Sequence, residues 1–174
     1  MLLEYEHNRT VRSHGCSIQP LNKIIRMKIV PEKIHLLEVR NNKSQITASD
    51  EYINRPIAPA EINMDFGHEA AFNFEQKGAR IRFFSLFTGV NEQSEEIGLN
   101  AEFNFELHFR IDNFEEFVKE DNGTKRIESL LMVTLIGIVF STCRGIIMEK
   151  TAASYFKKLI IPIIDPASLV KHNS

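Results

Sequence analysis

The sequence predicts an α+β fold in which a four-stranded antiparallel sheet packs on a long C-terminal helix, followed by a short last helix. Two observations lead to this class. The segments that alternate apolar and polar residues, as strands do, all precede the long helical pattern, and short polar turns join the last three of them. The first two strands are instead joined by a long crossover at residues 41–60.

Length and composition describe one globular domain. The chain has 174 residues, of which 43% are hydrophobic and 25% charged, and its net charge is -2. Its basic residues are scattered, so nucleic acid is not an expected partner. Residues 1–20 are polar and aperiodic, and we expect a mobile tail or a short helix there, followed by the domain at residues 21–174. No secretory signal is recognisable, and Cys16 and Cys143 stand far apart, which together predict a cytoplasmic protein.

The first strand is predicted at residues 23–40, where Pro31 bends it. Residues 41–60 then form a connection that is polar at first and apolar in its second half. A loop of this length in a compact domain is usually disordered or functional, and its apolar side chains favour a functional loop.

The other three strands follow from the period-two alternation of their apolar residues. They are expected at residues 62–74, with an interruption at Gly67-His68, at residues 79–90, and at residues 101–112. Polar turns are expected at residues 75–78 and 91–98. On the third strand, Phe84 and Leu86 share a face with arginines, so we expect part of that face to be covered.

The long helix is predicted at residues 126–149, with its N-terminal cap at residues 121–124. It is apolar on every side, as a covered helix is, and its uncharged stretch at residues 130–140 is shorter than the roughly 18 residues of a membrane span. Small residues share one side of it: Thr134, Gly137, Ser141 and Gly145. Two interpretations stay open, glycines tolerated in a core helix or close packing against the same helix of a second copy.

Beyond the long helix, the apolar run at residues 159–164 contains Pro162 and cannot be a regular helix. Asp165-Pro166 is a start signal for a short last helix at residues 167–170. The chain therefore closes on a second, much shorter helical element.

The sequence offers no recognisable catalytic or metal site. Its six histidines lack the spacing of metal ligands, its eight glycines are isolated, and Cys143 inside the helix is expected to be a small buried hydrophobe. We therefore expect no enzymatic activity, no metal and no other cofactor. Thirteen phenylalanines indicate an apolar surplus, which favours oligomerisation, binding of apolar partners, or both.

The order of these elements resembles the SecB export chaperone family and its SecB-like relatives. The segment Phe103-Asn104-Phe105-Glu106-Leu107 is similar to the family's fourth-strand pattern of an aromatic residue, two variable residues, a glutamate and an aliphatic residue. Residues 143–169 are similar to the end of its long helix, the loop after it and its final helix. The resemblance covers residues 22–170 and implies the SecB-like fold.

The resemblance implies a holdase chaperone that binds non-native polypeptides in apolar grooves and keeps them unfolded, often for export. It implies a homotetramer, a dimer of dimers with the long helices between two sheets, and neither catalysis nor membrane insertion. The strip of small residues on the helix fits that interface. By position, the client-binding residues would be Tyr52, Ile53, Ile57, Ile62, Met64, Ile161, Ile163, Leu169 and Val170.

In classical members an acidic sheet surface meets the translocation motor SecA. Glu106 matches one of those acidic positions and Glu38 a second, whereas Lys33 stands near the position of a third acid. The chain also ends without the family's acidic tail. The resemblance therefore implies SecA or a dedicated client, such as an antitoxin, as the partner.

Two other functions stay open. One is a structural or adaptor subunit whose apolar surfaces are covered by a permanent partner. The other is a hot-dog-like acyl-CoA thioesterase, whose central helix is also wrapped by an antiparallel sheet. In that fold, however, the helix precedes most strands, and here only Glu128 stands near the helix start as a catalytic acid.

Overall fold

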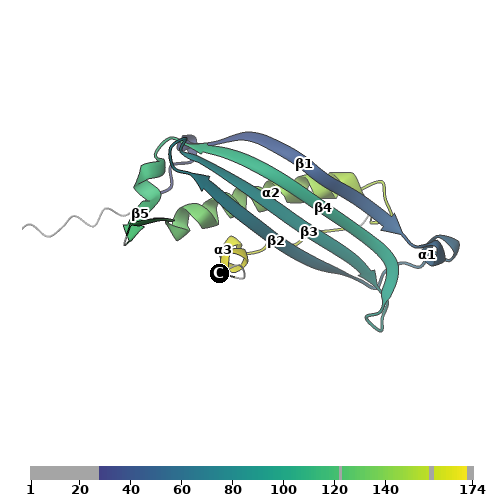
Figure 1. Cartoon of the computed structure of the whole chain (residues 1–174). Coiled ribbons are helices and arrows are strands. Elements are labelled where there is room, and N and C mark those ends of the chain that lie inside the picture. Colours follow the sequence, from purple (N-terminus) through teal and green to yellow (C-terminus); the bar gives the residue numbers. More distant parts are fainter. Residues whose placement is uncertain (1–27, 122, 157–158, 172–174) are drawn as a thin grey trace, which may run out of the picture.

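The computed structural model describes residues 28–121, 123–156 and 159–171. The predicted tail at residues 1–20 and the first five residues of the predicted first strand lie outside them. Within the described residues the architecture is α+β, as predicted, with the sheet on one side and the long helix and the last helix on the other (Figure 1).

The main sheet has four antiparallel strands in the order β1-β4-β3-β2. Their bounds are β1 Ile34–Ala48, β2 Glu61–Asn73, β3 Gly78–Val90 and β4 Glu96–Ile111. Cross-strand pairs such as Ile81 with Leu107 and Phe83 with Phe105 place the apolar parity of every strand on one face. We call this the inner face, and the opposite one the outer face.

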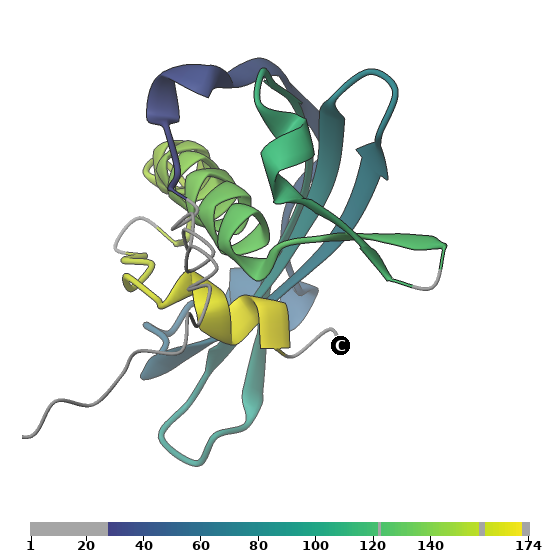
Figure 2. The same ribbon diagram turned by 90° about the vertical axis from the view of Figure 1, so that its left-hand side faces the viewer.

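Helix α2, Ser129–Thr151, packs on the inner face (Figure 2). Its buried residues are Leu131, Leu135, Ile136, Val139, Phe140, Cys143, Ile147 and Thr151. The Phe140 ring meets the rings of Phe66 and Phe83 edge-on, with centroids 5.4 and 6.0 Å away. Such edge-to-face contacts add to the free energy of burial and fix the position of α2 over β2 and β3.

Strand β1 differs from the prediction at both ends. It begins at Ile34, after a short 3-10 turn at Pro31–Lys33, and continues to Ala48, so the crossover is only residues 49–60. The missed stretch is polar on both faces over residues 41–45, so apolar alternation returns only with the half-buried Ile46 and Ala48. It is a strand because it is an edge strand that pairs with the long β4 as far as Leu99.

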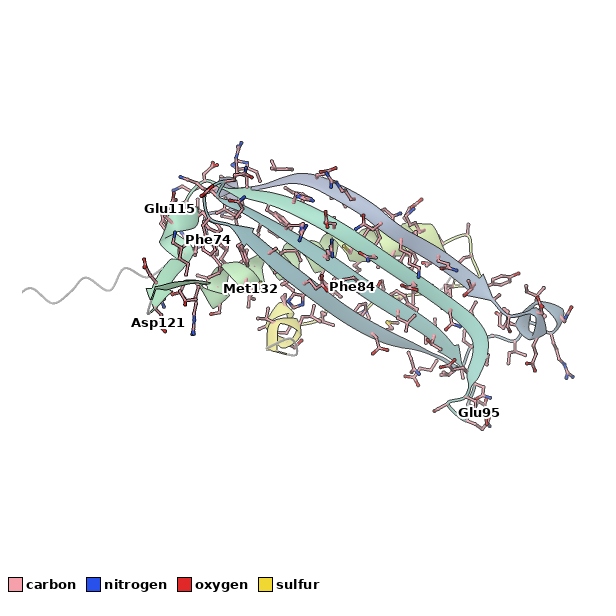
Figure 3. The ribbon with its side chains drawn as sticks, in the orientation of Figure 1. Phe74, Phe84, Glu95, Glu115, Asp121 and Met132 are labelled. Carbon is pink, nitrogen blue, oxygen red and sulfur yellow. The ribbon has the colours of Figure 1, made fainter. Side chains whose placement is uncertain are left out.

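One further prediction about the strands is wrong and another agrees with the structure in part. Strand β2 is not interrupted at Gly67-His68, since its ladder with β3 runs without a shift through both residues. On the outer face of β3, Phe84 is half-buried and Leu86 is 42% exposed, so the described part of the chain covers this face only partly. Phe84 lies beside Leu86 on the same strand (Figure 3).

The predicted cap of the long helix is wrong. Residues 118–127 form a small hairpin of β5, Val118–Asp121, and β6, Thr124–Ile127, which projects from the body in Figure 2. Gly123 in its turn has a φ of 77°, and an Asn-Gly pair is a stronger signal for a hairpin than for a helix cap. Helix α2 begins at Ser129 without a side-chain cap.

The short helices complete the fold. Helix α3, Pro166–Lys171, is the predicted last helix, and Asp165 Oδ1 accepts a hydrogen bond from Ala167 N at 3.0 Å. No helix forms at the described residues of the Pro162 segment, as predicted. The crossover contains a short helix that the sequence analysis missed, α1, Asp50–Asn54, and a 3-10 turn at Phe114–Phe117 follows β4.

Helix α1 is fixed to β4 by a close approach between Ser49 and Gly98. Ser49 Oγ caps α1 by accepting a hydrogen bond from Tyr52 N at 3.1 Å, and Ser49 N donates to Gly98 O at 2.8 Å. Gly98 has a φ of 75°, and a Cβ there would overlap Ser49 Oγ. Only glycine satisfies both requirements at this position.

We predict that Gly98→Ala lowers the free energy of unfolding by about 2 kcal/mol or more, because it adds left-handed backbone strain and displaces the cap. Urea denaturation followed by circular dichroism measures this. The control Ser49→Ala removes only the cap and should cost about 1 kcal/mol. Equal losses in both variants would show that the close approach is not what requires glycine.

Candidate functional site

A cavity of about 850 Å³ lies between the crossover, the start of β2 and the chain after α2. Its lining residues are Tyr52, Pro56, Ile57, Ala58, Pro59, Ala60, Glu61, Ile62, Met64, Ser154, Tyr155, Phe156, Leu159 and Ile160. Nearly all of them are apolar or aromatic. We call it the crossover cavity.

The crossover cavity has a rigid floor and exposed walls. Tyr52 is 6% exposed, because the capped helix α1 holds it against the core, and its ring meets Tyr155 edge-on at 5.4 Å. On the walls, Ile57, Tyr155 and Ile160 are 48%, 53% and 71% exposed. Large apolar side chains that gather around a hollow and face solvent indicate a binding surface.

Four of the nine residues that the resemblance placed at the client site line this cavity: Tyr52, Ile57, Ile62 and Met64. Ile53 is exposed on the adjoining helix α1. The others lie elsewhere: Ile161 is fully buried, Ile163 is 85% exposed beside a second hollow, and Leu169 and Val170 are mostly buried on α3. The structure therefore gathers the crossover residues and separates them from the C-terminal ones.

Sequence reasoning missed the opposite wall, which is formed by Tyr155, Phe156, Leu159 and Ile160. Leu159 and Ile160 belong to the apolar run at residues 159–164, so the sequence carried a signal for them. Tyr155 and Phe156 lie in the short stretch after α2, where apolar residues do not recur at a helical or strand spacing. Only the fold brings them opposite the crossover.

A second hollow, of about 600 Å³, follows the strip of small residues on α2. Thr134, Gly137 and Ser141 line it. A Cβ at Gly137 would lie 3.2 Å from Pro166 Cγ, so this glycine admits the chain's own α3, whereas Gly145 has open space around it. The strip therefore packs against α3 of the same chain at Gly137, whereas Ser141 and Gly145 are exposed.

The outer face carries a buried carboxylate, Glu106, whose side chain is 8% exposed. Arg82 Nε donates a hydrogen bond to it at 3.0 Å, and His108 Nε2 lies 2.8 Å from its other oxygen. Arg40 and Arg80 approach to 3.7 and 4.0 Å. The hydrogen bonds from Arg82 and His108 hold the pKa of Glu106 below its usual value, so it is ionised near neutral pH.

The second predicted partner-binding acid is paired in the same way. Arg40 Nε donates to Glu38 Oε1 at 2.7 Å, which lowers the pKa of Glu38. Both acids are thus engaged by arginines of the same sheet face. A partner that needs free carboxylates here would first have to compete with those arginines.

The described residues show little that resembles a catalytic or metal centre. They contain no group of three or more His, Cys, Asp or Glu that could hold a metal ion. Cys143 is fully buried, as predicted, and burial raises the pKa of its thiol to about 12, so it stays protonated at neutral pH.

Helix α2 is long and apolar enough to cross a membrane, judged by length and composition. The argument from the uncharged stretch at residues 130–140 is therefore wrong, because no charged residue of α2 appears before Arg144 and the 23-residue helix is long enough for a span. Core helices of soluble proteins meet the same criterion, and α2 buries one side against the sheet here.

No protein-family model matches the chain, and no curated protein matches its sequence. Among solved structures it is similar to the Mycobacterium tuberculosis Rv1957 SecB-like chaperone in complex with a ChAD peptide from the Rv1956 HigA1 antitoxin. The two share 14% identity over 76% of this chain and 91% of that one, with a TM-score of 0.52. This likeness supports the SecB-like fold.

A protein of unknown function from Streptococcus agalactiae is also similar, with 12% identity over 75% of this chain and 96% of that one. Its TM-score of 0.36 is too low to support an argument. The likeness to the Mycobacterium tuberculosis structure therefore shows a SecB-like fold. Any conclusion about function must be argued from the geometry of this chain.

We predict that Glu106→Gln lowers the free energy of unfolding at pH 7 by about 2 kcal/mol, because arginines around it lose their counter-charge. Since hydrogen bonds hold the folded-state pKa of Glu106 below its usual value, its contribution to stability is complete above the usual pKa and is lost as the pH falls through the folded-state pKa. The variant should therefore lose less stability than the wild type between pH 7 and pH 3.

Chemical denaturation across this pH range measures both effects. Glu102→Gln is the matched control, since Glu102 lies four residues away on the same face of β4 but is 48% exposed. An unchanged pH slope in Glu106→Gln would contradict the prediction.

Proposed function

We propose that the protein is a holdase chaperone that binds non-native polypeptides in the crossover cavity and keeps them unfolded. The observation that carries this proposal is a preformed apolar hollow whose walls expose Ile57, Tyr155 and Ile160 to solvent. The SecB-like fold supports it, since the similar Mycobacterium tuberculosis protein is a chaperone in complex with an antitoxin peptide.

The physical basis is burial of apolar surface. A client side chain in the cavity removes both itself and the exposed wall residues from water, at roughly 25 cal/mol per Å² of apolar surface. This driving force is not directional and needs little sequence information, so folded proteins, which hide their apolar residues, are not bound. No catalytic group or cofactor takes part.

We further propose that the protein assembles as a homotetramer, a dimer of dimers. Helix α2 is apolar all round but packs on the sheet with one side only, and Leu130 is 40% exposed on it. Ser141 and Gly145 are exposed on the strip. A second copy of α2 packed along the exposed half of the strip would cover Ser141 and Gly145, because small side chains allow close backbone approach.

The client is proposed to be a dedicated polypeptide, such as an antitoxin, rather than a protein handed to SecA. Glu38 and Glu106 are both engaged by arginines, so this sheet face does not offer the free acids that SecA meets in classical members. Export remains the alternative destination. The protein is proposed to act in the cytoplasm, without membrane insertion or nucleic acid.

We predict that the double variant Ile57→Ser/Ile160→Ser binds an unfolded, reduced protein at least tenfold more weakly than the wild type, because two cavity walls become polar. Fluorescence anisotropy of the labelled client gives the affinity. Leu86→Ser is the control, since Leu86 is comparably exposed but lies on the outer face. Equal weakening by the control, or no capture by the wild type, would refute the proposed function.

We predict that Gly145→Leu reduces the mass in light scattering from about four times 20.0 kDa to that of a smaller species. The protomer should stay folded, because no atom of the described chain lies within 4 Å of a Cβ at Gly145. Lys150→Leu, exposed on the same helix but off the strip, should leave the mass unchanged. A wild-type monomer, or a tetramer in both variants, would reject this interface.

A further inference from the structure

The second hollow is an apolar surface that the described part of the chain leaves open. Ile163 stands at its rim and is 85% exposed, the largest exposed fraction among the large apolar residues described. Ile138 of α2 and Ile164 of the segment before α3 also line it. Its volume of about 600 Å³ has room for several aliphatic side chains, and an exposed apolar hollow of this kind is normally covered by a partner segment.

The segment at residues 159–164 separates this hollow from the crossover cavity. Its first two residues line the crossover cavity, whereas Ile163 and Ile164 line the second hollow. The segment belongs to no helix or strand, and Arg144 Nε on α2 donates a hydrogen bond to Ile161 O at 2.7 Å. Because one segment forms a wall of both hollows, whatever fills the second hollow also supports the wall of the crossover cavity.

The described chain begins on the side of α2 where the second hollow lies. Figure 2 shows its first residues, in purple, on the side of α2 that faces away from the sheet. Ile29 packs against the buried core, so this stretch is held close to the body of the protein. Ten residues of chain can span up to roughly 33 Å, so the ten residues before Lys28 are long enough to reach the hollow.

These ten residues, 18–27, have the composition that an apolar hollow requires. Half of them are large and apolar: Ile18, Leu21, Ile24, Ile25 and Met27. The segment has two basic residues and no acidic one. Asp165 is exposed between two lining residues of the hollow, so basic side chains beside it meet an opposite charge. Both the apolar and the charged residues of the segment therefore suit this place.

A second copy of the chain is the competing occupant. It reaches the hollow only at the concentration of the protein, whereas residues 18–27 are tethered to it through Lys28 and have an effective concentration in the millimolar range. The proposed contact between two α2 helices is made at Ser141 and Gly145, toward the C-terminal end of the strip. Tethering therefore favours the chain's own segment over a second copy.

We propose that residues 18–27 cover the second hollow of the same chain, with their aliphatic side chains in contact with Ile163 and Ile164. By filling the hollow, the segment holds residues 159–164 in the position that shapes the crossover cavity. This support of the cavity wall rests on the proposed chaperone function, whereas the cover itself does not.

The chain contains no tryptophan, so a single introduced one reports on the hollow alone. In full-length Ile163→Trp, acrylamide should quench the fluorescence only weakly, because the segment shields the indole. Adding Ile24→Ser and Ile25→Ser should raise the quenching constant about threefold or more, since the segment loses the apolar contact that holds it in place. Leu86→Trp on the outer face is the matched control, and the two serines should leave its quenching unchanged.

A cross-link tests the same contact without weakening it. In a Cys16→Ser background, Ile25→Cys and Ile163→Cys should form a disulfide within one chain under mild oxidation, while the fully buried Cys143 stays reduced. Ile25→Cys paired with Leu86→Cys should form none. Electrophoresis without reductant separates a bridge within one chain from a bridge between two chains.

Two results would overturn the cover. One is equally strong quenching of Ile163→Trp with and without the two serines. The other is a cross-link between chains only, which would make the second copy the occupant. Shielding that disappears when the protein is diluted would lead to the same conclusion.

The support of the cavity wall has its own readout. The double variant Ile24→Ser/Ile25→Ser, without tryptophan, should capture an unfolded protein about threefold more weakly than the wild type. If the segment shields the hollow but capture is unchanged, the cover stands and its support of the wall fails. If the wild type captures no unfolded protein, the proposed chaperone function fails and the cover is judged by quenching and cross-linking alone.

Discussion

The contact between α2 and the inner face of the sheet is the constraint on which the rest of the structure depends. Phe140 of α2 packs edge-on against Phe66 and Phe83, which the ladder between β2 and β3 holds side by side. Because the sheet is covered on this face alone, charge is confined to the other one. The buried Glu106 with its arginines is the result of that division.

The same contact explains why part of the apolar surface of the chain stays exposed. A single helix covers the middle of a wide sheet and leaves its two ends to loops. At one end the crossover and the chain after α2 stay apart, and the space between them is the crossover cavity. The half of α2 that faces away from the sheet stays partly exposed for the same geometric reason.

Much of the fold could be predicted from the sequence, and the failures have physical causes. The strands that bury one face were recognised, because burial of one face makes apolar and polar residues alternate along the sequence. The end of β1 was missed because residues 41–45 of this edge strand are polar and exposed on both faces. The hairpin at residues 118–127 was missed because an Asn-Gly pair was read as a cap.

The candidate site was predictable only in part. The crossover wall was found through an apolar loop and a family resemblance, but Tyr155 reaches it only because α2 ends where it does. The arginines around Glu106 come from positions 24 and 66 residues earlier in the chain, and only the strand order makes them neighbours. Cross-strand electrostatics of this kind leave no local pattern in the sequence.

The crossover has a kinetic consequence for capture. Its two ends are bonded to neighbouring strands, Ser49 N to Gly98 O and Ala60 N to Val90 O, and Pro56 and Pro59 restrict the backbone between them. Such a wall has little conformational entropy left to lose, so under the proposed chaperone function a client would meet a surface already in its binding shape. Encounter, rather than ordering of the loop, would then set the rate of capture, and this rate matters because small domains fold within milliseconds.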